Sequence, residues 1–80
     1  MKEYNGYKSW NRWNVSLWIN NDEFTYTWAR NLTIAYGRKT AARTIVDSYK
    51  ILNGGPSPKT PDGAIYNYAS VYDALEGIAE

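Results

Sequence analysis

The stretch from Ser9 to Phe24 constrains the fold more than any other part of the chain, because it holds three of the four tryptophans. On a helix with about 100° per residue, its apolar side chains form two stripes: Trp10, Trp13 and Leu17 on one side, and Val15, Trp18 and Ile19 on the other. A helix that is apolar on two sides usually lies between other elements. The sequence therefore predicts that this helix is central to the domain and that Trp13 lies in its core.

The alternative for this stretch is a β-strand, because apolar and polar residues alternate from Trp13 to Ile19. Trp18 breaks the alternation, and no hairpin turn with a partner run follows. The helix is therefore the better prediction.

Composition limits what can hold such a fold together. Eighty residues form one domain, residues 1–80, and a chain this short buries only about 60% of its unfolded surface. The chain has no Cys or His, so we expect neither a disulfide nor a tight zinc site. Its thirteen aromatic residues, each able to bury about 150–250 Å², supply the core instead. No segment reaches the roughly 18 apolar residues of a membrane span, and because the N-terminus has no apolar run we expect no signal peptide.

Apolar spacing and turn residues predict an all-α fold, a compact four-helix domain with a short N-terminal arm and an irregular 54–68 segment. The expected helices cover about 10–20, 22–36, 40–53 and 69–79. Ser9, Thr40 and Ser70 are the expected N-caps for the first, third and fourth helices, and Asn21 for the second. A buried face of the second helix is predicted from residues at spacings of three and four: Phe24, Trp28, Leu32, Ala35 and Tyr36. The third helix is expected to bury Ala42, Ile45, Val46, Tyr49 and Leu52.

Two motifs of the chain can be compared with known sequences. The first, YNGYKSWNRWNVSLWINNDEF, follows the pattern N-G-[YW]-x-[NS]-[YW]-x-T-W-N-V-A-L-W-[IL]-x-N-[DE]-E at these positions: Asn5, Gly6, Trp13, Asn14, Val15, Leu17, Trp18, Asn21, Asp22 and Glu23. The second, KTPDGAIYNYASVYDAL, is similar to a T-P-D-G-[VA]-x-[WY] ending. Both resemble a family of small uncharacterised tailed-phage proteins, which usually has Glu-Thr where this chain has Asn11 and Arg12. The resemblance implies a phage origin and the cytoplasm of an infected bacterial cell, and it implies no activity.

Catalytic groups are scarce in this sequence. Without Cys there is no thiol nucleophile, and without His the usual general base is missing. Asp22 and Glu23 are adjacent, so they do not share a helix face, and they complement the dipole of the second helix. Asp73 and Glu76 fall on the expected solvent face of the fourth helix. We therefore expect no enzyme activity, no metal and no cofactor.

Basic residues gather where the third helix is expected to begin. The candidate basic patch consists of Arg30, Arg38, Lys39 and Arg43. Helices 22–36 and 40–53, with a three-residue turn between them, have helix-turn-helix proportions. Against nucleic-acid binding, the net charge is only +1, and the third helix offers few base-reading side chains. A solvated basic face is the simpler interpretation. Residues 60–80 carry four acidic groups and no basic one, so we expect this tail to pack near the basic middle of the chain.

The aromatic excess is the second candidate signal, because Trp and Tyr are favoured anchors in protein interfaces. The candidate partner-binding residues are Trp10, Tyr4, Tyr7, Tyr66, Tyr68 and Tyr72. We expect a small phage accessory protein, monomeric or homodimeric, that binds and modulates a bacterial host or defence protein, in host takeover or as an anti-defence inhibitor. The alternative is a small helix-turn-helix-like nucleic-acid-binding regulator.

Overall fold

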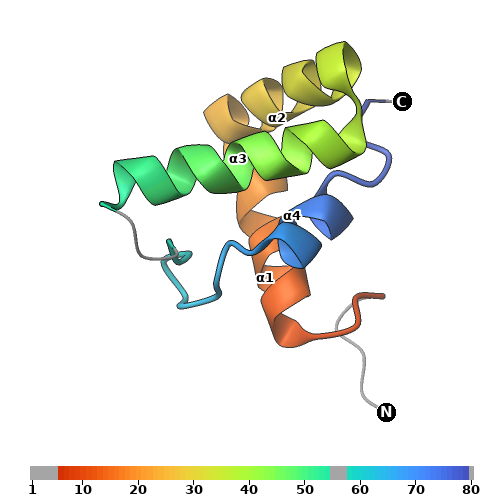
Figure 1. Ribbon diagram of the computed structural model, residues 1–80. Coiled ribbons are helices and arrows are strands. Elements are labelled where there is room, and N and C mark those ends of the chain that lie inside the picture. The colour runs from red at the N-terminus through yellow and green to blue at the C-terminus, as the bar shows by residue number, and fades with distance from the viewer. Residues whose placement is uncertain (1–5, 55–57, 80) are drawn as a thin grey trace.

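A computed structural model of the chain describes residues 6–54 and 58–79. Within these ranges it contains four helices and no strand, which confirms the all-α fold: α1 (Trp10–Asn21), α2 (Glu23–Tyr36), α3 (Arg38–Leu52) and α4 (Tyr68–Ala74). The helices form a ring in which α1 and α3 each pack against both α2 and α4 (Figure 1). The radius of gyration is 11.8 Å, close to the roughly 11.6 Å expected of a compact chain of this length.

The helix α1 begins as the sequence predicts. The Ser9 hydroxyl accepts the backbone N–H of Arg12 at 3.2 Å and thereby pairs one of the orphan donors of the first turn. Val15 and Ile19 are fully buried, whereas Trp13 is partly exposed and lies outside the core cluster. The prediction of a core Trp13 is therefore wrong, since Trp13 lies about 200° around the helix from Val15. The expectation that this helix lies between other elements agrees with the structure: α1 packs against α2, α4 and the 58–65 segment, and it buries Asn14, Val15, Ser16 and Ile19.

The corner after α1 is capped by Asp22 rather than by Asn21. The Asp22 carboxylate accepts the backbone N–H of Thr25 at 3.0 Å and its hydroxyl at 2.7 Å, while Asn21 is the last residue of α1. These two hydrogen bonds hold the pKa of the Asp22 carboxyl below its ordinary value. A carboxylate accepts both donors of Thr25 and also meets the positive end of the helix dipole, so aspartate suits this position better than asparagine.

The connection between α2 and α3 is a single residue, Gly37. Its φ of 90° lies in the region that side chains disfavour, and this lets the chain reverse direction without a longer loop. The helix α3 therefore starts at Arg38, two residues before the predicted start, and Thr40 lies within the helix instead of capping it. The expected three-residue turn is absent.

The predicted buried face of α2 is only partly correct. Trp28 and Leu32 pack against the core, but Phe24, Ala35 and Tyr36 are exposed. On α3, Leu52 is exposed in the same way, although Ile45 and its neighbours are buried as predicted. Phe24 and Leu52 lie at the end of the α2–α3 hairpin that is remote from Gly37, where the C-terminal end of α3 extends past the beginning of α2 (Figure 1).

The helix α4 is shorter than predicted and begins two residues earlier than its expected cap. Asn67, not Ser70, is the N-cap, and its side chain accepts the Ser70 N–H at 2.9 Å. Ser70 is instead buried in the contact with α1, where its hydroxyl accepts a hydrogen bond from Asn11 at 2.7 Å. After Ala74 the chain continues as turns, with Gly77 at a φ of 72°.

The segment between α3 and α4 is irregular as predicted, apart from an isolated antiparallel bridge between Lys59 and Ile65 in its described part. Side chains of α1 hold this segment in place through hydrogen bonds. Asn14, which is 1% exposed, donates to the Asp62 carboxylate at 2.9 Å and accepts the Thr60 hydroxyl at 2.6 Å, while the Trp18 indole also donates to Asp62 at 3.0 Å. We refer to these four residues, Asn14, Trp18, Thr60 and Asp62, as the polar joint.

The polar joint connects the two sequence motifs to each other. Asn14 and Trp18 belong to the N-terminal motif, and Thr60 and Asp62 to the T-P-D-G motif. These motif positions therefore have a structural explanation, because the buried side chains of Asn14 and Thr60 find their hydrogen-bond partners in each other and in the exposed Asp62 carboxylate. The residues of the joint are poor candidates for function, and the binding surface has to be sought elsewhere on the domain.

Candidate binding surface

Two tyrosines of α4 form the centre of the candidate surface. Tyr68 and Tyr72 are one helical turn apart, so their side chains share a face of α4. Their rings stack with centroids 5.7 Å apart and an interplanar angle of 22°. The rings are thereby held in one arrangement before any ligand arrives.

Two arginines of α3 flank this stack. The Arg38 guanidinium lies 3.8 Å from the centroid of the Tyr72 ring, and its Nε donates to the Tyr72 carbonyl oxygen at 2.8 Å. The Arg43 guanidinium lies 5.9 Å from the centroid of the Tyr68 ring. Cation–π contacts of this kind contribute about 0.5–2 kcal/mol, depending on how far they are removed from water. We call the series Arg38–Tyr72–Tyr68–Arg43 the arginine–tyrosine ladder.

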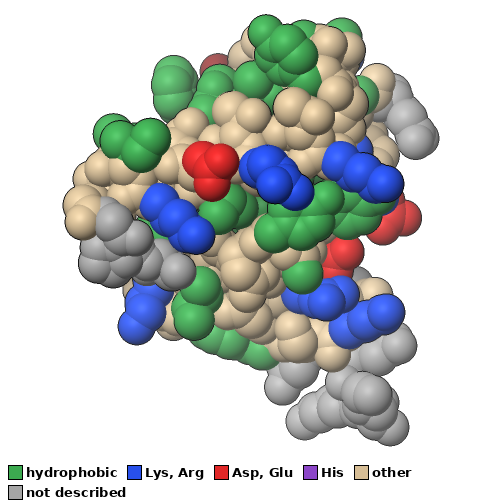
Figure 2. All heavy atoms as spheres, in the orientation of Figure 1, with side chains coloured by type: hydrophobic (Ala, Val, Ile, Leu, Met, Phe, Trp, Pro, Cys, Tyr) green, Lys and Arg blue, Asp and Glu red, His purple; other side chains and the backbone are tan. Residues whose placement is uncertain are grey.

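The ladder has a closed end and an open end. Arg38 and Tyr72 are partly buried between α3 and α4, whereas Arg43 is exposed and Tyr68 is 39% exposed. Next to the open end is a hollow of about 280 Å³, with these lining residues: Arg43, Val46, Asp47, Lys50, Tyr66, Asn67 and Tyr68. Figure 2 shows this face of the molecule, where basic side chains lie along α3 with hydrophobic side chains directly beneath them.

The charge of the hollow is mainly positive. Arg43 and Lys50 contribute two cations, and Asp47 is the one acidic residue in its lining. The aromatic ring of Tyr68 forms an apolar wall next to Arg43. An anionic group on a ligand could therefore meet a cation and an aromatic ring at the same place.

The predicted basic patch is divided by the structure. Arg38 and Arg43 are brought together with the tyrosines of α4, as described above. Arg30 is partly buried on α2, and Lys39 is exposed on α3. Within residues 6–54 and 58–79, neither of these two takes part in an ion pair or a cation–π contact.

The predicted aromatic set is divided as well. Tyr66 packs edge-on against Tyr49 with ring centroids 4.7 Å apart, and burial raises the pKa of its phenol to about 12, with a further contribution from nearby Tyr49 and Asp22. The Tyr7 hydroxyl and Ser16 Oγ form a hydrogen bond of 2.7 Å. Trp10 is 38% exposed at the start of α1, and Tyr4 lies outside the described residues. Tyr68 and Tyr72 are the two members that join the basic patch.

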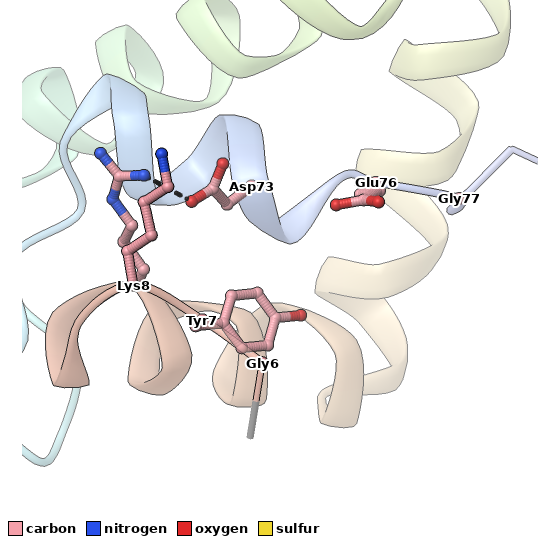
Figure 3. Close-up of a pocket in the computed structure, with 7 residues that line it drawn as sticks. Gly6, Tyr7, Lys8, Asp73, Glu76 and Gly77 are labelled. Atoms are coloured by element: carbon pink, nitrogen blue, oxygen red, sulfur yellow. Dashed lines mark hydrogen bonds and ion pairs between the residues drawn. The ribbon is translucent and has the colours of Figure 1, made fainter. Parts of the chain in front are cut away.

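A second hollow, of about 570 Å³, lies between the start of α1 and α4 (Figure 3). Here the Arg12 guanidinium forms an ion pair with the Asp73 carboxylate at 3.0 Å, and both side chains are about 30% exposed. Lys8 and Glu76 also line the hollow, so positive and negative groups are balanced. The acidic tail is expected near the basic middle of the chain; α4 does contact Arg38 and Arg43 of α3, but this ion pair joins its Asp73 to Arg12 of α1 instead. The ion pair also gives Asp73, expected on the solvent face of the fourth helix, a partner on α1.

Other kinds of site find no support in the described part of the chain. No group of three or more His, Cys, Asp or Glu side chains there could hold a metal ion. None of the helices in that part is long and apolar enough to cross a membrane.

The fold and this surface define the class of the protein: a small all-α domain with an exposed aromatic and basic face. The chain belongs to a family of unknown function, DUF7249, whose family model matches residues 1–80. No curated protein and no solved structure matches the chain. The surface must therefore be interpreted from its own chemistry.

Two features of the surface were missed at the level of sequence. The pairing of Arg38 with Tyr72 and of Arg43 with Tyr68 joins residues 34 and 25 positions apart. The spacing of four between Tyr68 and Tyr72 is the one local signal of a shared face. The polar joint was marked more clearly in the sequence than this spacing, because all four of its residues lie in the two motifs.

Proposed function

We propose that this chain binds an acidic surface of another protein through the open end of the arginine–tyrosine ladder. The observation that carries the proposal is that Tyr68 and Arg43 are exposed while the rest of the ladder holds them in place. Tyr and Arg are among the residues that most often dominate binding energy in protein interfaces. A side chain that is already ordered loses less entropy on binding, and this favours affinity.

We further propose that the partner is a bacterial host or defence protein encountered during phage infection. The support for this step is the resemblance of the two motifs to small tailed-phage proteins. A phage protein of this size that has neither Cys nor His acts most simply by occupying a surface of its target. The activity proposed is therefore inhibition or redirection of a bacterial protein in host takeover or anti-defence.

The second candidate function is nucleic-acid binding, favoured by the basic residues along α3. Two observations weigh against a helix-turn-helix arrangement. The turn is one residue, Gly37, where such motifs have three or four. Arg38, at the start of the would-be recognition helix, is engaged with Tyr72 of α4 rather than presented to a groove.

The test compares capture of a partner from bacterial lysate by the parent chain and by three variants. Tyr68→Ala and Arg43→Glu should each reduce affinity by about 30-fold or more, the range of an interface hot spot. Lys39→Glu is the matched control, because Lys39 is equally basic and exposed on α3 but lies outside the ladder. It should retain capture. Thermal melting of each variant checks that the fold is intact.

Salt dependence separates the two candidate functions. Binding to DNA through several phosphates falls steeply with salt, with a slope near −0.9 per phosphate neutralised. Protein binding centred on Tyr68 should fall less steeply, since apolar contact is not screened. Sub-micromolar, sequence-selective DNA binding that is abolished by Arg43→Glu would replace the proposal with the second candidate. Equal capture by Tyr68→Ala and the parent chain would also contradict it.

A further inference from the structure

The end of the α2–α3 hairpin that is remote from Gly37 carries unusually exposed apolar side chains. Phe24, at the start of α2, is 79% exposed, and Leu52, at the end of α3, is 81% exposed. Both line one hollow of about 320 Å³, together with Thr25, Trp28, Ser48 and Tyr49. Clustered apolar exposure of this kind marks an interaction surface more often than scattered single residues do. We call the hollow the hairpin groove.

The floor of the hairpin groove is made of aromatic side chains packed on one another. The Trp28 and Tyr49 rings lie 6.0 Å apart between centroids, and Tyr49 in turn packs edge-on against Tyr66 at 4.7 Å. All three side chains pack against the buried core. An occupant of the groove would therefore meet a surface that is already formed.

The two rims of the groove carry opposite charges. On the α2 side are Asp22 and Glu23, both exposed. On the other side, beyond Leu52, a neighbouring hollow of about 240 Å³ is lined by Lys59 as well as by Leu52 and Tyr49. Across this end of the molecule the order is thus acidic, apolar and basic.

This order is complementary to itself. A two-fold rotation about an axis through the apolar centre places the acidic rim of one copy opposite the basic rim of the other, and the reverse contact forms at the same time. Such an isologous contact is the commonest way in which soluble chains form dimers. A partner carrying charge of one sign would leave one of the two rims opposite a like charge.

We propose that the hairpin groove is the interface of a homodimer, in which Phe24 and Leu52 of two copies pack together and Glu23 of each copy faces Lys59 of the other. This proposal is independent of the proposed function, because the arginine–tyrosine ladder uses other residues. The dimer is weak, with a Kd on the order of 10–100 µM, as suits a small apolar patch with charges at its rim.

Sedimentation equilibrium over a range of concentrations tests the apolar part of the interface. Leu52→Ser and Phe24→Ser should each weaken dimerisation by at least tenfold. Ile51→Ser is the matched control, because Ile51 is 79% exposed beside Leu52 but lines neither hollow. Its dimerisation should match that of the parent chain. A parent chain that stays monomeric to about 1 mM, a concentration ten times the weakest expected Kd, overturns the proposal, as does equal weakening by Ile51→Ser.

A mixing experiment tests the two-fold arrangement of charges. Glu23→Lys and Lys59→Glu should each weaken self-association several-fold, because like charges then face each other at both rims. When the two variants are mixed, both rims pair opposite charges, since the two reversed residues face each other at one rim and the two unchanged residues face each other at the other. The mixed dimer should therefore recover the parent affinity. Failure of the mixture to associate better than either variant alone overturns the proposed pairing. Asp22 is left unchanged because it caps α2.

Discussion

The two halves of this domain are held together by different interactions. Where α1 meets the 58–65 segment and α4, hydrogen bonds between side chains connect residues far apart in the chain, as in the polar joint. In the α2–α3 hairpin, packing of apolar and aromatic side chains predominates, and the projecting end leaves Phe24 and Leu52 in solvent. The first half uses its polar groups within the fold, and the second half exposes apolar groups that the fold does not use.

The comparison shows which residue types are informative about function in a small domain. Polar motif residues such as Asn14 and Asp62 look like a candidate site, yet the fold itself accounts for them. Apolar residues such as Leu52 look like core, yet they lie on the surface. Chemical type alone is thus a weaker guide than the presence or absence of a partner within the fold.

The largest expected effect comes from breaking the polar joint at its buried member. Asn14→Ala removes both hydrogen bonds, leaves the Thr60 hydroxyl without its acceptor and opens a small void. We expect a loss of about 2–3 kcal/mol in the free energy of unfolding, from unpaired polar groups and lost packing. Urea unfolding followed by tryptophan fluorescence measures it. A loss below about 0.5 kcal/mol, the range of ordinary surface substitutions, would show that the joint does not stabilise this half.

A smaller effect is expected from Thr60→Val, which keeps the shape of the side chain. Thr60 is buried, donates to Asn14 and accepts the Ala64 N–H at 3.0 Å. The loss should be about 1–2 kcal/mol, the cost of removing a buried hydroxyl and leaving its partners unpaired. Combining it with Asn14→Ala should cost less than the sum of the two single changes, because both remove the same hydrogen bond. Strict additivity in the double-mutant cycle would contradict a shared interaction.

The pH dependence of stability should separate the polar joint from the aromatic packing of Tyr66 on Tyr49. Hydrogen bonds from Asn14 and Trp18 lower the pKa of Asp62 in the folded state, so its contribution is present above the unfolded pKa of about 3.9 and is lost as the pH falls through the folded pKa. Tyr66 has its pKa raised to about 12 by burial, so the unfolded chain ionises first, and stability falls as the pH rises from about 10 towards 12.

Two variants assign these limbs of the stability curve. Asp62→Asn should flatten the acid limb and leave the alkaline limb unchanged, and Tyr66→Phe should do the opposite. The pKa of Asp22 is also lowered, so Asp22 contributes to the acid limb as well. That contribution should persist in the Asp62→Asn variant. Denaturant midpoints measured at a series of pH values provide the comparison. If Asp62→Asn leaves the acid limb unaltered, the polar joint does not contribute to the loss of stability at low pH.

The smallest effect is expected at the exposed end of the hairpin. Phe24→Ala and Leu52→Ala should each change the free energy of unfolding by no more than about 0.5 kcal/mol, although both remove large apolar side chains. The measurement is made at low micromolar concentration, where self-association does not contribute. A loss of about 2 kcal/mol or more, typical of a core truncation, would show that these residues belong to the core.

Local features of the sequence predicted much of this fold. Ser9 as a cap, the end of the second helix at Tyr36 and the irregular segment after α3 each depend on residues within one or two turns of each other, and all three are present. The predicted buried face of α2 failed at Phe24 because burial depends on where a neighbouring helix ends, and periodicity does not contain that information. Ser70 failed as a cap because its hydroxyl has a distant partner, Asn11 of α1.

The candidate surface was predictable only in its parts. The residue types were recognised as two separate sets, and the fold combines Arg38 and Arg43 with Tyr68 and Tyr72. The Tyr7 hydroxyl is occupied by Ser16, and the Tyr66 ring is packed on Tyr49 although it still lines the hollow beside the ladder. Whether an aromatic side chain already has a partner within the fold depends on contacts between distant segments. A single sequence does not contain that information.

The polar joint also has a consequence for how the chain is made. Asn14 leaves the ribosome early, but its partners Thr60 and Asp62 follow 46 and 48 residues later. At about 5–20 residues per second, α1 waits on the order of 2–10 s before that surface is covered. The α2–α3 hairpin needs only its own neighbouring residues and can form meanwhile. For those seconds the tryptophan-rich first helix of the nascent chain is available to chaperones and proteases, and the ladder does not yet exist.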